Sequence, residues 1–277
     1  MRWTSEVYIK YMNKSELKQE FLNAGFVSGL EIIDSDAAMA HRQSMQRIEA
    51  DFGPLHYKSK IHTLLRSPLE LATHKNALDI VQQLIGPDIL LYNVNYIVKE
   101  AGTTSHVSWH QDLTYWGFDC DDQVSMWLAL SPATRESGCM RMIPGSHKAG
   151  KQLHVLTDDN SNVLFSGQTV QGVSEAEAVL CPLAPGQASF HHGWTLHAST
   201  ANQSDDRRIG LNVQYIAPHM KQTKHSEDTA MLVRGRDRFN HFGRNLPPAY
   251  DLEPAAIARQ AELEQRYQQI ARAKQPA

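Results

Sequence analysis

The sequence predicts a mainly β protein, in which α-helices flank a double-stranded β-helix core of the jelly-roll or cupin-like type. Short apolar or alternating stretches, separated by turn residues, follow one another between about residues 88 and 217. Helical patterns lie before this region and near the end of the chain. A His-x-Asp motif has its candidate partners far away in sequence, and a jelly roll brings such distant strands together.

Composition limits the function classes. The chain has 277 residues, 42% of them hydrophobic, and a net charge of −3, which is typical of a globular protein and does not favour nucleic acid as a partner. No apolar run approaches the roughly 20 residues that span a bilayer, and the opening residues lack the apolar core of a secretory signal. Three widely spaced cysteines indicate reduced thiols. We therefore expect a cytoplasmic protein that acts on a small molecule, without a membrane or nucleic-acid partner.

We expect residues 1–277 to form a single domain. Its predicted parts are a helical region at about 13–86, a jelly-roll core at about 88–217 and a C-terminal extension at about 218–277. Within the last part, residues 254–273 form an amphipathic helix, which packs either on its own chain or on a second copy in a homodimer.

The N-terminal region predicts three helices. The first begins at Ser15 and ends at Gly25, and the second covers residues 36–51 with Met39 and Met45 toward a core. The third covers residues 69–85 and ends at a Gly-Pro pair. Lysines 58 and 60, which precede it, are expected in solvent, with an acidic ligand as the alternative.

A strand at residues 92–99 follows. Asn93, Asn95, Ile97 and Lys99 share one of its faces because side chains alternate along a strand. The two asparagines face either a wet barrel interior or solvent at a sheet edge.

His110 and Asp112 are two residues apart, so on a strand they point to the same side. With His197 from a distant strand, they would form a two-histidine, one-carboxylate triad on one face of a metal ion. Such a triad suits non-haem Fe(II) oxygenases because it leaves three positions open, two for a 2-oxo acid and one for O2. The tripeptide alone is weak evidence, since structural histidines produce the same pattern by chance.

Arg208 shares a strand face with Gly210 and Asn212. An inward guanidinium needs a partner, and a carboxylate matches its planar fork. Tyr115 and Trp116 follow the metal motif and form either a substrate pocket wall or part of the core. Residues 148–176 and 231–244 carry no clear pattern; the first suits a lid, and the second covers the barrel mouth or lies on the surface.

Three motifs together resemble the phytanoyl-CoA dioxygenase family of Fe(II)- and 2-oxoglutarate-dependent oxygenases. The first is His110-Gln111-Asp112, and the second is the Gly-x-x-x-x-x-Pro-Gly-Ser-His element at residues 138–147. The third is His197-Ala198-Ser199 with Arg208 eleven residues after the histidine. This spacing favours His197 over His191 and His192 as the ligand, and Arg208 over Arg207.

The resemblance implies Fe(II), 2-oxoglutarate and O2 as cofactor and co-substrates, with release of succinate and CO2. It implies that Ser199 and Trp127 help Arg208 to hold 2-oxoglutarate. Asp112 favours hydroxylation, because related halogenases have a small residue there. The expected substrate is a small polar metabolite, either an aminophosphonate such as 2-aminoethylphosphonate or a natural-product intermediate. Its candidate contacts are Trp116, Tyr115, Asn95 and Arg141.

Two other functions stay open at this point. A zinc-dependent hydrolase or isomerase on a cupin-like barrel uses the same ligand types but needs neither Arg208 nor oxygen. A non-catalytic relative that binds a metabolite would tolerate a damaged triad, and this triad is intact.

Overall fold

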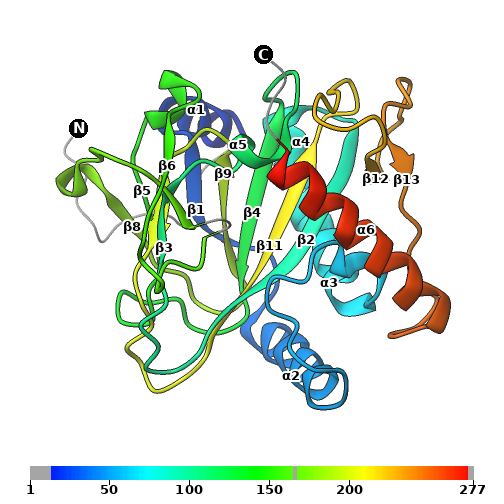
Figure 1. Ribbon diagram of the computed structural model, residues 1–277, viewed down its shortest axis with the longest axis horizontal. Helices are drawn as coiled ribbons and strands as arrows, with labels where there is room; N and C mark the ends of the chain where they lie inside the picture. The colour runs from blue at the N-terminus through cyan, green and yellow to red at the C-terminus, as the bar shows by residue number, and fades with distance from the viewer. Residues whose placement is uncertain (1–13, 165–166, 274–277) are drawn as a thin grey trace. The chain divides into compact units, whose positions relative to one another are not determined.

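The computed structural model describes residues 14–164 and 167–273 (Figure 1). Among these residues, the strands form a seven-stranded sheet, a four-stranded sheet and a two-stranded hairpin. The hydrogen-bonded order of the large sheet is β1-β9-β4-β11-β2-β12-β13, and that of the small sheet is β3-β10-β5-β8. Strands that are neighbours in these sheets are mostly distant in the chain, as a jelly roll requires, and the predicted fold class is confirmed.

The strands of the large sheet are β1 (Phe26–Glu31), β9 (Gln187–His192), β4 (Gln123–Ala129), β11 (Arg208–Ile216), β2 (Ile89–Lys99), β12 (Thr229–Arg234) and β13 (Gly243–Arg244). Those of the small sheet are β3 (Val107–His110), β10 (His197–Ser199), β5 (Met140–Met142) and β8 (Val179–Cys181), and the hairpin is β6 (His154–Leu156) with β7 (Gln168–Val170). The α-helices are α1 (Lys14–Ala24), α2 (Ser35–Phe52), α3 (Arg66–Ala72), α4 (Lys75–Ile85), α5 (Leu113–Trp116) and α6 (Pro254–Arg272).

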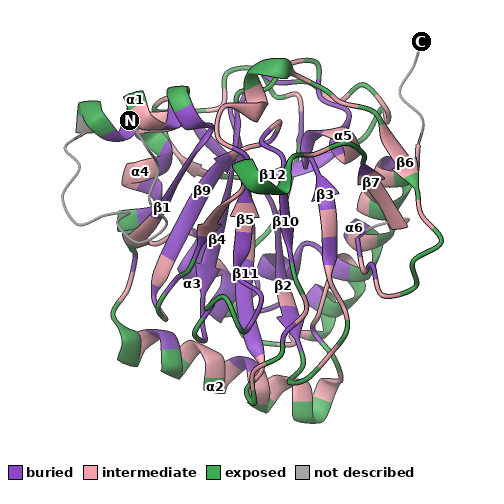
Figure 2. Cartoon of the chain, turned by 90° about the vertical axis from the view of Figure 1, so that its left-hand side faces the viewer, coloured by how far each residue is buried: buried purple, intermediate pink, exposed green. Residues whose placement is uncertain are grey.

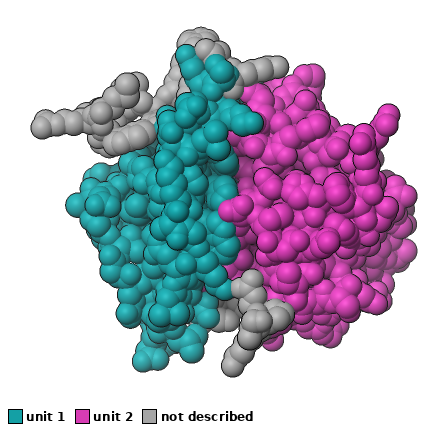
Figure 3. Space-filling model, turned by 90° about the horizontal axis from the view of Figure 1, so that it is seen from above, with its two compact units in different colours: residues 1–39, 98–112, 127–210 teal, residues 40–97, 113–126, 211–277 magenta. Residues whose placement is uncertain are grey.

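Contacts divide the chain into two compact units (Figure 3). Unit 1 contains residues 1–39, 98–112 and 127–210, and unit 2 contains residues 40–97, 113–126 and 211–277. Strands β2, β4 and β11 each run from one unit into the other. These units do not follow the three predicted parts of the chain, and the single domain stays a prediction.

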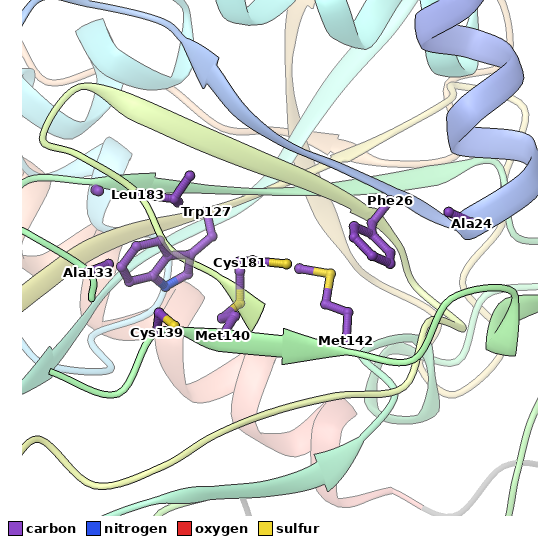
Figure 4. Packing of buried hydrophobic residues seen from close by; sticks show 10 residues of the cluster. Ala24, Phe26, Trp127, Ala133, Cys139, Met140, Met142, Cys181 and Leu183 are labelled. Carbon is purple, nitrogen blue, oxygen red and sulfur yellow. The ribbon is translucent and has the colours of Figure 1, made fainter. Parts of the chain in front are cut away.

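The core of unit 1 lies between strands of both sheets (Figure 4). Phe26 of β1 and Trp127 of β4 face Met140 and Met142 of β5, and Cys181 of β8 belongs to the same cluster. All five side chains are buried. Removing a large apolar side chain from water contributes roughly 1.5–3 kcal/mol. This packing holds the strands that carry the candidate site in place. Cys139 and Cys181, both buried in this cluster, are free thiols.

The polar insert of unit 1 is folded against the small sheet. Its hairpin β6–β7 is antiparallel, and the Oγ of Ser108 in β3 donates to the carbonyl of Gln168 at 2.6 Å. The indole nitrogen of Trp109 donates to Glu175 at 2.8 Å. The pairing of β6 with β7 was missed because strands of three residues leave almost no periodic signal.

The core of unit 2 contains an aromatic cluster around Tyr92 of β2. The Tyr92 ring meets Trp116 and Phe118 edge-on, with centroids 6.1 and 4.9 Å apart. The Trp116 indole nitrogen donates to the hydroxyl of Tyr267 on α6 at 2.9 Å. Helix α6 therefore packs on its own chain, as one of the two predicted alternatives states, and Phe242 of the Arg-rich segment is buried in the same cluster.

Two sequence-based expectations about unit 2 are wrong, and one open alternative is decided. The predicted helix 69–85 is two helices, because His74 caps a new one by accepting from the backbone nitrogen of Asn76 at 3.3 Å. Lys60 is buried instead of solvated, and its ammonium donates to the carbonyls of Tyr92 at 2.5 Å and Thr229 at 2.7 Å. Asn93 is buried, not at a solvent-exposed edge, and its side-chain oxygen accepts from the backbone nitrogen of Lys60 at 2.6 Å.

The burial pattern along α2 corrects the expectation that Met39 faces the core. Ala38 and Met45, which are two helical turns apart, form the buried face, whereas Met39 is exposed one position away from it. Figure 2 shows the contrast between this helix, with its exposed side, and the buried strands. None of the helices within the described ranges has the length and apolar character needed to span a membrane.

Candidate active site

The predicted metal ligands come together on two paired strands of the small sheet. His110 at the end of β3 is directly opposite His197 at the start of β10. The Nε2 atoms of both histidines lie 3.6 Å from the same oxygen, Oδ1 of Asp112. All three residues are buried, and their ligand atoms lie within 4.8 Å of one another. Three donors thus converge on one point, as a metal ion requires.

Backbone carbonyls fix which nitrogen each histidine offers. Nδ1 of His110 lies 2.8 Å from the carbonyl of Ser108, and Nδ1 of His197 lies 3.0 Å from that of Thr195. Since a carbonyl only accepts, each Nδ1 carries the proton and each Nε2 presents its lone pair to the metal point. Burial and the neighbouring histidines 110 and 191 hold the pKa of His197 well below its ordinary value, which keeps the ring neutral.

Asp112 is held by a third histidine. Burial alone would raise the pKa of its carboxyl, but His197, His110 and His191 hold that pKa well below the ordinary value. Nε2 of His191, on β9, lies 3.2 Å from Oδ2 of Asp112, the oxygen that faces away from the triad nitrogens. This contact leaves Oδ1 as the metal-facing atom. Two imidazole nitrogens and one carboxylate oxygen fit a divalent transition-metal ion such as Fe(II).

Gln111, between the two ligands, connects the His110–Asp112 motif to the insert at residues 148–176 through hydrogen bonds. Its amide nitrogen donates to the carbonyls of Gly150 and Trp194, both at 2.8 Å. Its amide oxygen accepts from the backbone nitrogen of Gln152 at 2.7 Å. A buried amide with satisfied donors and acceptor holds its backbone in one conformation, so the residue that separates the ligands also orients them.

Arg208 is buried at the start of β11. Its Nη1 donates to the carbonyl of Gly138 at 2.5 Å, and its guanidinium carbon lies 5.0 Å from the centroid of the Trp127 ring. Trp127 therefore stacks on the cation and keeps its plane fixed. Gly138 belongs to the second sequence motif, so two of the motifs that are distant in the chain meet at this arginine.

Lys99 is a residue of this region that the motifs did not reveal. It is buried at the end of β2, and its Nζ donates to the Oγ of Ser199 at 2.7 Å and to the carbonyl of Thr200. Burial, with Arg208 as the next cause, lowers its pKa to about 6. Strand alternation gave the only available signal, because it placed Lys99 on the same face as the asparagines. Lys99 orients the serine that was predicted to help hold 2-oxoglutarate.

This burial predicts a pH-dependent stability difference. The pKa of Lys99 falls from 10.5 in a free side chain to about 6 in the fold, so between these values the unfolded chain binds the extra proton. Folding is then penalised at pH 7, and the penalty fades as the pH rises toward 10.5. Between pH 7 and pH 9, we expect the free energy of unfolding of wild type to rise by about 2 kcal/mol relative to that of Lys99→Met. Urea unfolding of both proteins measures it, and a constant difference contradicts it.

Gly210 is needed for the position of Trp127. A Cβ at residue 210 would lie 1.9 Å from Cζ2 of the Trp127 ring, so the ring must move. We expect Gly210→Ala to raise the KM for 2-oxoglutarate about tenfold and to cost about 1–3 kcal/mol of stability. Gly243→Ala, at another strand glycine with a nearest contact of 3.3 Å, is the control. Equal KM values for the two variants would show that the position of Trp127 does not affect the binding of 2-oxoglutarate.

The predicted substrate contacts are divided between the two units. Arg141 lies in unit 1, where it pairs with Glu175 and stacks on Trp109 at 5.1 Å. Trp116, Tyr115 and Asn95 lie in unit 2. Trp116 is buried in the aromatic cluster, which is the core position given as its alternative. A substrate contact stays a prediction for all four residues.

Comparisons with known proteins agree with this geometry. The chain matches the phytanoyl-CoA dioxygenase family profile over residues 28–210, more than half of its length. It is 26% identical over 198 residues to a probable alpha-ketoglutarate-dependent hypophosphite dioxygenase of Stutzerimonas stutzeri, covering 69% of this chain and 65% of that protein. It is 29% identical over 149 residues to a 1-deoxypentalenic acid 11-beta-hydroxylase of Streptomyces arenae, covering 50% and 51%. These matches cover less than two thirds of either relative.

Solved structures share the fold. The non-heme monooxygenase ThoJ superposes with a TM-score of 0.81 and 30% identity, covering 92% of this chain and 97% of that one. The epimerase SnoN, solved with Fe3+ and alpha-ketoglutarate, has a TM-score of 0.64 at 20% identity, covering 76% and 85%, and supports the fold alone.

The fold and the triad together define a non-haem iron, 2-oxoglutarate-dependent oxygenase. Within that class, the chain belongs to the phytanoyl-CoA dioxygenase family. The predicted use of iron and 2-oxoglutarate agrees with this family and with the metal-binding triad.

Proposed function

We propose that this protein hydroxylates an unactivated C–H bond of a small polar metabolite and releases succinate and CO2. The observation that carries the proposal is the convergence of His110, Asp112 and His197 on one point, with an intact carboxylate. Iron, when bound there with 2-oxoglutarate, supplies the oxidising chemistry.

The chain's own residues supply binding and orientation. His110 and His197 present Nε2 because the N–H group at Nδ1 of each ring donates a hydrogen bond to a backbone carbonyl. His191 contacts Oδ2 of Asp112, so that Oδ1 remains for the metal. Arg208, whose guanidinium stacks on Trp127, would pair with the far carboxylate of 2-oxoglutarate, and Trp127 and Ser199 would help to hold it. A buried guanidinium gains most from such a bidentate anion.

The choice of substrate class rests on the named relatives. One is named for hypophosphite, a phosphorus anion without a C–H bond, and another for 1-deoxypentalenic acid, a mainly hydrocarbon acid, and both substrates are small and carry an acidic group. We therefore retain the two predicted classes, aminophosphonates and natural-product intermediates.

A substrate panel tests the proposal. Full-length protein with Fe(II), 2-oxoglutarate and O2 is given 2-aminoethylphosphonate, other aminophosphonates and small terpenoid acids, and succinate release is measured with mass analysis of each compound. The expected result is a product 16 Da heavier that forms in proportion to succinate. Turnover without oxygen, or full activity with zinc in place of iron, would support the hydrolase or isomerase alternative.

A further inference from the structure

A second group of metal-ligating side chains lies in unit 2. Cys120 and Asp122 precede β4, and His219 follows β11. One ligand atom from each residue lies within 4.8 Å of the other two. The three residues have no part in the oxygenase chemistry proposed above.

Backbone hydrogen bonds hold the two segments of this group together. The backbone nitrogen of Asp119 donates to the carbonyl of Lys221 at 3.1 Å, and the nitrogen of Lys221 donates to Oδ1 of Asp119 at 2.7 Å. The nitrogen of Ala217 donates to the carbonyl of Asp122 at 3.0 Å. These bonds lie on both sides of the ligand positions. The two segments are therefore already held together in the fold, and metal binding would cost little further loop-closure entropy.

The imidazole is oriented toward the other two ligands. Nε2 of His219 lies 2.8 Å from Oδ2 of Asp122, and the ring packs edge-on against Phe239 with centroids 6.1 Å apart. Both polar side chains remain about half exposed, at 44% and 55%. An ion from solution can therefore reach them.

The electrostatics of the group favour a cation. Burial and the carboxylates of Asp119 and Asp122 raise the pKa of the Cys120 thiol to about 11. Asp121 adds a further acidic side chain to the same loop. A divalent ion would offset this negative charge and stabilise the thiolate, whose proton leaves to solvent on binding.

We propose that Cys120, Asp122 and His219 form a zinc-binding site separate from the iron triad. A thiolate, an imidazole and a carboxylate are the three ligand types that zinc takes in proteins, and water completes the tetrahedron. The soft sulfur separates this site from the triad, which offers only nitrogen and oxygen. Zinc would link the loop before β4 to the loop after β11.

Cobalt(II) distinguishes the two sites, because a tetrahedral ion with a thiolate ligand absorbs through sulfur-to-metal charge transfer. We titrate full-length wild type, Cys120→Ser and Asp112→Ala with Co²⁺ and record absorbance. The charge-transfer band is expected in wild type and in Asp112→Ala and is expected to vanish in Cys120→Ser. A band that survives in Cys120→Ser, or no band in wild type, overturns the proposal.

A charge-matched pair tests the carboxylate. Asp122→Asn and Asp121→Asn remove the same charge from the same loop, but only Asp122 offers a ligand oxygen to the group. Competition with a chromophoric chelator should show Zn²⁺ affinity at least roughly tenfold weaker in Asp122→Asn and unchanged within about twofold in Asp121→Asn. Equal losses in the two variants would mean diffuse attraction of the ion and no site.

Wild-type protein gives a readout that does not depend on any variant's folding. At pH 8, Zn²⁺ binding should release about one proton from Cys120, because its thiol has a raised pKa and only the thiolate ligates zinc. Calorimetric titration in two buffers of different ionisation enthalpy measures this proton, and binding without proton release would refute sulfur ligation.

Discussion

Asp112→Ala is expected to lower succinate formation to below about one-hundredth of the wild-type rate at saturating Fe(II). The substitution removes the oxygen that both Nε2 atoms share at 3.6 Å, and it leaves His191 without its carboxylate partner. Chromatographic measurement of succinate after a fixed reaction time checks the result.

A surface carboxylate controls for this change. Asp51→Ala removes an exposed acid near the end of α2 and should leave the rate unchanged within about twofold. If Asp112→Ala formed succinate as fast as this control, Asp112 would not be a metal ligand.

Arg208→Ala is expected to raise the KM for 2-oxoglutarate between roughly 30-fold and several thousand-fold, since losing one partner of a buried charge pair costs about 2–5 kcal/mol. The dissociation constant for Fe(II) should change much less, because no triad atom is removed. Steady-state kinetics with 2-oxoglutarate as the varied substrate, together with metal titration, separate the two effects.

Arg207→Ala is the matched control for this arginine. Arg207 is adjacent in sequence, but it forms an outward ion pair with Glu100 at 2.8 Å. Such surface pairs contribute roughly 0–1 kcal/mol, so the KM should stay within about twofold of wild type. A similar rise in both variants would show that general positive charge, and not the buried guanidinium, binds the co-substrate.

The contrast between these two arginines shows how far the sequence pattern reaches. Strand alternation already separated an inward Arg208 from an outward Arg207, and the structure buries only Arg208. The same period of two was applied to His110 and Asp112, but β3 ends at His110 and Asp112 lies in the turn before α5. The two ligands do converge, but the turn, and not strand alternation, places the carboxylate beside the histidines.

Features that depend on distant packing were harder to predict. Lys60 is buried because carbonyls from residues 32 and 169 positions away accept its protons. The capping role of His74 is uncommon, so the sequence offered no helix stop there. The group formed by Cys120, Asp122 and His219 joins residues up to 99 positions apart, with no spacing motif to reveal it.

The most direct test of the central claim is an anaerobic titration of the metal-free protein with Fe(II) and 2-oxoglutarate, followed by visible absorbance. We expect a weak metal-to-ligand charge-transfer band that appears only when both are present and that is lost in Asp112→Ala. This result would establish 2-oxoglutarate on an iron held by the triad. No band in wild type, with zinc retained tightly by the triad instead, would contradict the oxygenase account.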